Sequence, residues 1–76
     1  MNFIKLTLLD DNLIAVNLDN VFYIEQYVKK EENSNTFITA ICDINGELTF
    51  VKENIDEIYS IIEMMQKTNR RAYSMR

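Results

Sequence analysis

The hydrophobic periodicity of this chain changes once, at about Asn54. Before that point, apolar residues alternate with polar ones over short runs, which is typical of β-strands that bury one face. After it, apolar residues recur every three or four positions, as in an amphipathic helix. This pattern predicts an α+β fold, in which a five-stranded, mainly antiparallel β-sheet built of β-hairpins is followed by one C-terminal α-helix.

Short polar segments divide the first part of the chain, and all the predicted strands fall within about residues 3–52. We expect them at residues 3–9, 13–18, 21–28, 36–44 and 47–52. Asp10-Asp11-Asn12 favours a turn, because these side chains accept hydrogen bonds from nearby amides. Asn45-Gly46 predicts a type I′ turn, which needs positive φ at both central residues. The polar segment Lys29–Asn35 is interpreted as a solvated, mobile loop.

The helix is predicted over about residues 55–71, with Asn54 as its N-cap and Glu57 three residues later, as in a capping box. Residues 72–76 carry no stop signal and are expected to form a basic tail. The chain has no linker or internal repeat, so residues 1–76 are predicted to form a single small domain.

Self-association is expected from the size of the chain and from the width of its apolar helix stripe. A chain of 76 residues buries roughly 63% of its surface on folding, which is near the lower limit for a self-sufficient core. A single cysteine excludes an internal disulfide. Three residues widen the helix stripe beyond what one sheet covers, and we expect them at the contact of a homo-oligomer: Ile61, Met64 and Met65.

The composition argues against an enzyme. The chain has no histidine, one cysteine and one glycine, whereas metal sites, nucleophile–base pairs and phosphate-binding loops draw on these residues. We therefore expect no catalytic residue, no metal and no cofactor. Cys42 is interpreted as an inert core thiol. Glu25 and Glu53 carry the carboxylates for an acid–base pair, but nothing in the sequence brings them together.

The charge is divided unevenly along the chain. Residues 1–63 hold four lysines and twelve acids, a net charge of −8, whereas residues 64–76 hold four cations and no acid. The acidic body disfavours nonspecific DNA binding. The basic end offers an anion or partner contact through Lys67, Arg70 and Arg71. The alternative is that these cations offset the dipole at the C-terminus of the helix.

Three aromatic residues and two lysines lie around the predicted loop and form the most ligand-like group in the sequence: Tyr23, Tyr27, Lys29, Lys30 and Phe37. If they share one side, the aromatic rings can stack on a flat ligand and the lysines can meet a phosphate, as for a small nucleotide. The alternative is cross-strand aromatic packing. A partner protein is the other candidate occupant.

The chain offers no run of about 20 apolar residues, so no membrane span is predicted. Its first residues enter a strand pattern directly, which predicts no signal peptide. Together with the single thiol, this places the protein in the cytoplasm of a bacterial cell or of a phage-infected host.

A series of short segments resembles the FlbD family of small flagellar and swarming-motility proteins. The segments are Phe3-Ile4-Lys5-Leu6-Thr7-x-Leu9, Ile14-x-Val16-Asn17, Ile24-Glu25, Thr36-x-Ile38, Asn45-Gly46, Val51-Lys52-Glu53 and Glu57-Ile58. The likeness covers residues 3 to about 62 and departs from the family in the segment Lys29–Asn35 and after Met64.

The resemblance implies a small non-enzymatic binding or regulatory protein that contacts flagellar motor or regulatory machinery. It brings no catalytic residues with it. The alternative is an inhibitor encoded by a phage or mobile element, which either blocks a host defence protein or sequesters a nucleotide signal at a subunit interface. Both expectations include protein–protein contacts and a homo-oligomer.

Overall fold

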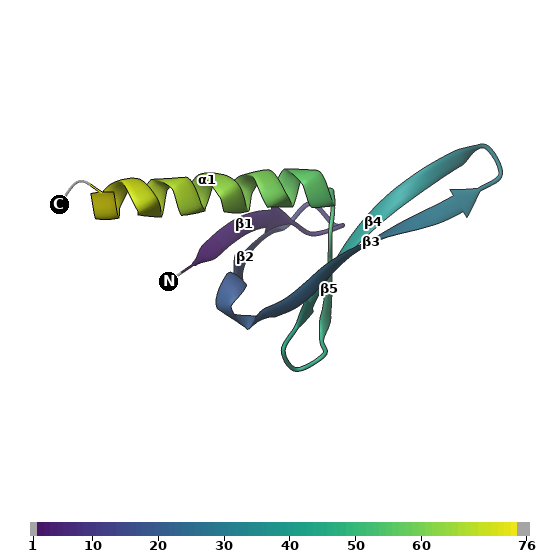
Figure 1. The fold of residues 1–76 in the computed structure, drawn as a ribbon. Helices are drawn as coiled ribbons and strands as arrows, with labels where there is room; N and C mark the ends of the chain where they lie inside the picture. The colour runs from purple at the N-terminus through teal and green to yellow at the C-terminus, as the bar shows by residue number, and fades with distance from the viewer. Residues whose placement is uncertain (1, 75–76) are drawn as a thin grey trace.

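The computed structural model describes residues 2–74, and the side chains of residues 2–67. The chain forms β1 (Phe3–Thr7), β2 (Leu13–Asn17), a 3-10 turn η1 (Leu18–Asn20), β3 (Val21–Glu31), β4 (Ser34–Asp43), β5 (Leu48–Val51) and α1 (Ile55–Ser74). The α+β class, the five strands and the C-terminal helix are confirmed (Figure 1). All strand pairs are antiparallel, and they form a two-stranded sheet, β1-β2, and a three-stranded sheet, β3-β4-β5.

The two sheets meet where β1 and β5 end. Leu8 forms a single antiparallel bridge with Val51, and the Lys52 amide donates to the Thr7 carbonyl at 2.8 Å. At the other end of the β1-β2 sheet, the Leu18 amide donates to the Asn2 carbonyl at 2.8 Å. The five strands therefore form two ladders joined at one corner, rather than one continuous sheet.

The segment Lys29–Asn35 is not a loop, and this expectation was wrong. β3 continues to Glu31 and β4 begins at Ser34, so only Glu32 and Asn33 turn the chain. Ladder pairs such as Lys30↔Asn35 satisfy the backbone polar groups. The long β3-β4 hairpin projects away from the rest of the molecule (Figure 1). The whole molecule, hairpin included, has principal extents of 56 × 27 × 21 Å.

The Asn45-Gly46 segment forms a turn, but not of type I′. Gly46 has φ of +84°, whereas Asn45 is not among the positive-φ residues of the described chain. The Gly46 amide donates to the Asp43 carbonyl at 3.0 Å and the Asp43 amide to the Glu47 carbonyl at 3.0 Å. This is a three-residue hairpin connection that ends in a left-handed residue.

The structure explains this turn through the Asp43 side chain. Its Oδ1 atom accepts from the Asn45 amide at 2.8 Å and from the Glu47 amide at 3.0 Å. These two bonds favour an Asx turn that starts at Asp43. The left-handed position consequently falls on Gly46 alone.

The turn between β1 and β2 repeats this geometry without glycine. The Leu8 amide donates to the Asn12 carbonyl at 2.8 Å, and the Asp11 amide to the Leu8 carbonyl at 3.0 Å. Asp11 takes the left-handed position, with φ of +71°. Asp10 accepts from the Asn12 amide at 3.1 Å, as the turn prediction requires.

Asn54 caps α1 as predicted. Its Oδ1 atom accepts from the Glu57 amide at 2.8 Å, and the Ile55 amide donates to Oε1 of Gln26 on β3 at 3.1 Å. The expected end of the helix was wrong, because α1 continues to Ser74 and residues 72–74 are helical. The predicted basic tail is thus mostly helix, and residues 75–76 lie outside the described chain.

The core lies between α1 and the two sheets. Its five buried apolar residues come from four elements: Ile4, Leu6, Ile41, Val51 and Ile58. α1 runs alongside the β1-β2 sheet, away from the tip of the long hairpin (Figure 1). Among the described residues, no helix combines the length and the apolar character that a bilayer crossing requires.

Candidate interaction surfaces

The β3-β4-β5 sheet has one face toward the core and one face away from it. Residues that pair across an antiparallel ladder share a face. Ile41 and Val51 are in the core, so their neighbours one position along, Ala40 and Phe50, which pair with each other, point outward. We call this side the outer face and define it by seven residues: Tyr23, Tyr27, Ile38, Ala40, Cys42, Leu48 and Phe50.

The outer face is apolar, and large side chains surround two small ones. Ala40 and Cys42 are 0% and 5% exposed on this side of the sheet. Tyr23, Tyr27, Leu48 and Phe50 are 41–46% exposed. The larger side chains around them form an apolar layer, which the Glu25 carboxylate, paired with Ala40, interrupts at one point. Such a layer on a small domain is typical of an interaction site.

Two tyrosines give this layer a polar margin. The Tyr27 hydroxyl donates to Glu25 at 2.9 Å. That hydrogen bond, with some desolvation and the negative charge of Glu25, raises the pKa of Tyr27. The Cys42 side chain raises the pKa of Tyr23 in the same way, again helped by desolvation. The pKa of each tyrosine therefore lies above its ordinary value, and the Tyr27 hydroxyl acts as a donor.

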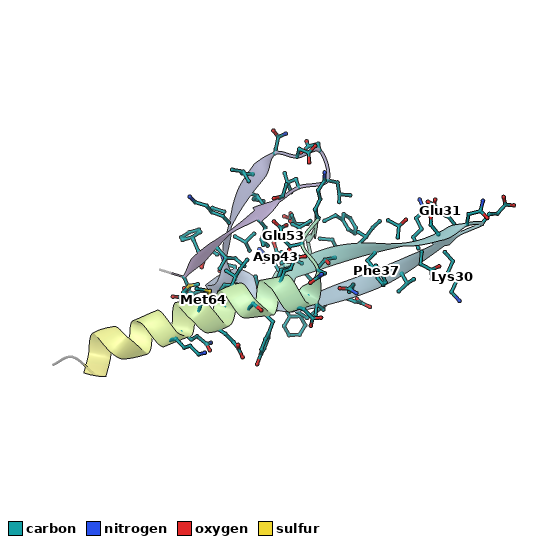
Figure 2. The ribbon with its side chains drawn as sticks, turned by 90° about the horizontal axis from the view of Figure 1, so that it is seen from above. Lys30, Glu31, Phe37, Asp43, Glu53 and Met64 are labelled. Carbon is teal, nitrogen blue, oxygen red and sulfur yellow. The ribbon has the colours of Figure 1, made fainter. Side chains whose placement is uncertain are left out.

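The ligand-like group predicted from the sequence divides between the two faces. Tyr23, Tyr27 and Lys29 alternate along β3 on the outer face. Lys30 pairs with Asn35 and Phe37 pairs with Val28, which places both on the opposite side. Figure 2 shows Lys30 and Phe37 on one side of the hairpin and Glu31 on the other. The structure thus does not bring all five residues together.

The helix residues predicted at an oligomer contact have two different surroundings. Ile61 and Met65 are half-buried and pack against the core, so they belong to the internal packing of the subunit. Met64 is exposed. Lys67 is also exposed, and the side chains of Arg70 and Arg71 lie outside the described residues.

Glu53 and Glu25 have separate structural roles. Glu53 accepts from the Thr7 amide and from the Thr7 hydroxyl, each at 2.9 Å, whereas Glu25 holds the Tyr27 hydroxyl on the outer face. Partial burial acts to raise the pKa of Glu53. The Thr7 amide, the amide of Glu53 itself and the Thr7 hydroxyl outweigh this effect, so the pKa lies below its usual value.

A groove between β3 and α1 forms one cavity of the described chain. It has a volume of about 310 Å³ and is lined by Ile24, Ile55, Asp56, Ile58, Tyr59 and Ile62. No local pattern in the sequence predicts this groove. Its signal in the sequence is the apolar helix stripe, but only the structure places Ile24 of β3 across a cavity from that stripe.

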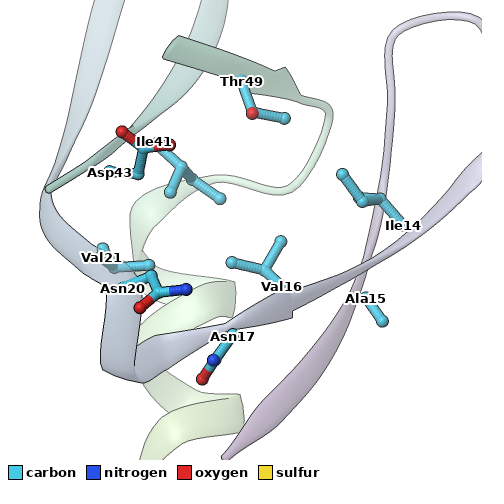
Figure 3. A pocket seen from close by; sticks show the side chains of 9 residues that line it. All are labelled: Ile14, Ala15, Val16, Asn17, Asn20, Val21, Ile41, Asp43 and Thr49. Carbon is cyan, nitrogen blue, oxygen red and sulfur yellow. The ribbon is translucent and has the colours of Figure 1, made fainter. Parts of the chain in front are cut away.

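A second cavity, of about 190 Å³, lies where β2 diverges from the β3-β4-β5 sheet (Figure 3). It is lined by Ile14, Ala15, Val16, Asn17, Asn20, Val21, Ile41, Asp43 and Thr49. The carboxylate in this cavity belongs to Asp43, and it already accepts hydrogen bonds from two amides of its own turn. Asn17 likewise accepts from the Asp19 amide at 3.1 Å. This cavity is a gap between the sheets, and its Asp43 and Asn17 side chains serve local turns.

Residues 2–67 hold no group of three or more His, Cys, Asp or Glu side chains placed to bind a metal ion. Comparison with protein families, curated proteins and solved structures finds no match to this chain.

Proposed function

We propose that this protein is a small non-enzymatic binding protein that acts through protein–protein contacts as a homo-oligomer. The outer face carries the proposal, because it presents exposed large apolar side chains around the buried residues Ala40 and Cys42. Aromatic residues with polar tips, such as Tyr23 and Tyr27, are enriched where proteins bind each other.

The resemblance to the FlbD family supplies the biological setting of the proposal. In that setting the outer face contacts a component of the flagellar motor or its regulation. The single buried thiol fits a reducing compartment, which favours action in the cytoplasm. The nucleotide alternative receives less support, because Tyr27 and Phe37 lie on opposite faces of the hairpin.

The experiment compares two phenylalanine variants in a flagellated bacterium that lacks its own copy of the gene. Phe50→Ser removes a ring from the outer face, whereas Phe37→Ser removes a more exposed ring, 56% accessible, from the opposite side of the hairpin. We expect Phe37→Ser to restore swimming in soft agar and Phe50→Ser to fail. Circular dichroism of both purified variants checks that they are folded.

Photo-crosslinking in the same cells tests for direct contact. A photoreactive residue at position 50 should give a discrete adduct with one partner protein, and the same residue at Asn33, on the hairpin tip, should not. Normal swimming by a folded Phe50→Ser variant would contradict the motility role. Equal crosslinking from both positions would contradict a binding site on the outer face.

A further inference from the structure

The outer edge of β3 is open. In the described chain β3 pairs with β4 alone. The turn Glu32-Asn33 makes Glu31↔Ser34 the closing pair of the hairpin, so the odd-numbered residues of β3 bond toward β4. The backbone N–H and C=O groups of the even-numbered residues point the other way: Ile24, Gln26, Val28 and Lys30. Such a row of groups is a template for another strand.

A groove runs beside this edge. The cavity of about 310 Å³ lies between Ile24 on β3 and Ile55, Tyr59 and Ile62 on α1, and Asp56 also lines it. A strand added to an edge beside a helix places alternate side chains in the groove between them. The hydrogen bond from the Ile55 amide to Gln26 fixes the start of the helix against the strand. The edge and the groove therefore form one preorganised site.

We propose that the occupant of this site is β3 of a second copy of this chain, paired antiparallel about a two-fold axis at Tyr27. This inference rests on the homo-oligomer of the proposed function and names its contact. The unpaired backbone groups belong to the even-numbered residues of β3, and those of the two copies must face one another. With the axis at Tyr27, Val28 therefore pairs with the partner's Gln26. Tyr27 then lies opposite the partner's Tyr27, in a non-hydrogen-bonded pair.

Charge selects this register. With the axis at Tyr27, Lys29 lies opposite the partner's Glu25, and by symmetry this pair occurs twice. Lys30 lies opposite the partner's Ile24 and reaches the groove that holds the partner's Asp56. An axis at Val28 would oppose Glu31 to the partner's Glu25, and like charges directly opposite are unfavourable.

Two other registers are less complementary. An axis at Glu25 would place two glutamates opposite each other, and an axis at Gln26 would leave Lys29 opposite the partner's Tyr23. The pairing about Tyr27 also joins the two outer faces into one surface, since each three-stranded sheet then continues into the other. It covers the open edge, which otherwise exposes the protein to uncontrolled aggregation.

Disulfide trapping tests the axis. In a Cys42→Ala background, Tyr27→Cys places two thiols across a non-hydrogen-bonded pair, where Cα atoms lie about 4.5 Å apart and a disulfide forms readily. Val28→Cys is the matched control, since the exposed fraction of Val28 is similar to that of Tyr27 on the same strand. In the proposed register Val28 faces the partner's Gln26, so the partner's Val28 lies two positions further along the strand. We expect mild oxidation to crosslink Tyr27→Cys as a dimer and to leave Val28→Cys uncrosslinked.

Charge reversal tests the register independently. Glu25→Lys and Lys29→Glu should each raise the dimer Kd by about tenfold, because two symmetric pairs become repulsive. The double variant restores both pairs and should return the Kd to about threefold of the wild type or less. Circular dichroism confirms that all three variants are folded.

The outcomes separate this inference from the function on which it rests. If the wild-type protein dimerises but neither single charge reversal changes the dimer Kd, the β3 contact is wrong and self-association still holds. The same conclusion follows if the Tyr27→Cys and Val28→Cys variants crosslink equally. A wild-type protein that remains monomeric overturns both. Loss of dimer in the single variants without recovery in the double variant also contradicts the register.

Discussion

The Glu53 carboxylate accepts two hydrogen bonds from Thr7, one from its backbone amide and one from its hydroxyl, each 2.9 Å long. These bonds link the end of β1 to the segment between β5 and α1, beside the place where Leu8 and Val51 form the only bridge between the two sheets in the described chain. The pair thus closes the corner of the fold that positions α1.

Glu53→Ala should lower the free energy of unfolding by about 1–3 kcal/mol, because it leaves the Thr7 amide and hydroxyl without their charged acceptor. Thr7→Val removes only the hydroxyl bond and should cost about 0.5–1.5 kcal/mol. Urea denaturation of both variants measures the difference. Equal stability of Glu53→Ala and the wild type would show that this corner does not depend on the pair.

The same contact predicts a dependence of stability on pH. The pKa of Glu53 is lower in the folded protein than its ordinary value of 4.5. The stabilisation is therefore complete above about pH 4.5 and is lost as the pH falls through the lower, folded pKa. Glu53→Gln lacks this titration, so its stability should fall less steeply on the acid side. Parallel acid profiles for the two proteins would contradict the assignment.

Gly46 tests backbone conformation in isolation. A Cβ added at this residue meets no atom within 4 Å, so a substitution there acts through its φ of +84°. Gly46→Asn should cost less than Gly46→Val, because asparagine tolerates the left-handed region, which costs other residues about 1–2 kcal/mol. Thermal unfolding compares the two variants, and identical midpoints would argue against the left-handed turn.

Asp11 occupies the equivalent position in the first turn and also forms an ion pair with Lys52. Asp11→Asn keeps a residue that tolerates positive φ and removes only the charge. Because both partners are exposed, we expect a loss of less than about 1 kcal/mol, which should disappear in high salt. Asp11→Val should cost more at every salt concentration, since it also strains the backbone.

Asn54→Ala should lower the free energy of unfolding by about 0.5–2 kcal/mol, because it removes the acceptor for the Glu57 amide at the start of α1. Asn54→Asp is the matched control, since aspartate is an equally good N-cap. Guanidinium denaturation measures both. A cost as large for Asn54→Asp as for Asn54→Ala would mean that the cap contributes nothing.

The sequence predicted the strands and the helix that bury one apolar face. It did not predict strand segments that bury neither face, because their residues show no hydrophobic alternation. Ile4 and Leu6 alternate because one side of β1 meets the core, so that strand was found. The half of the β3-β4 hairpin nearest its tip is exposed on both faces, and pairs such as Lys30↔Asn35 give no hydrophobic alternation. Backbone hydrogen bonds alone define those strands.

The candidate surfaces were predicted only in part, for a similar reason. The sequence indicated Tyr23 and Tyr27 but could not place Leu48 and Phe50 beside them, because that requires the register of β4 with β5. It likewise indicated a wide helix stripe, but Ile61 and Met65 pack inward, while Tyr59 and Ile62 line the groove beside β3. Tertiary placement, which no local pattern encodes, decided both surfaces.

Sedimentation velocity of the wild-type protein over a range of micromolar concentrations tests self-association most directly. Each chain has a mass of 9.0 kDa, and the pairing of two β3 strands predicts a species of about 18 kDa that dissociates on dilution. A single 9.0 kDa species at every concentration would contradict both the homo-oligomer and the β3 contact.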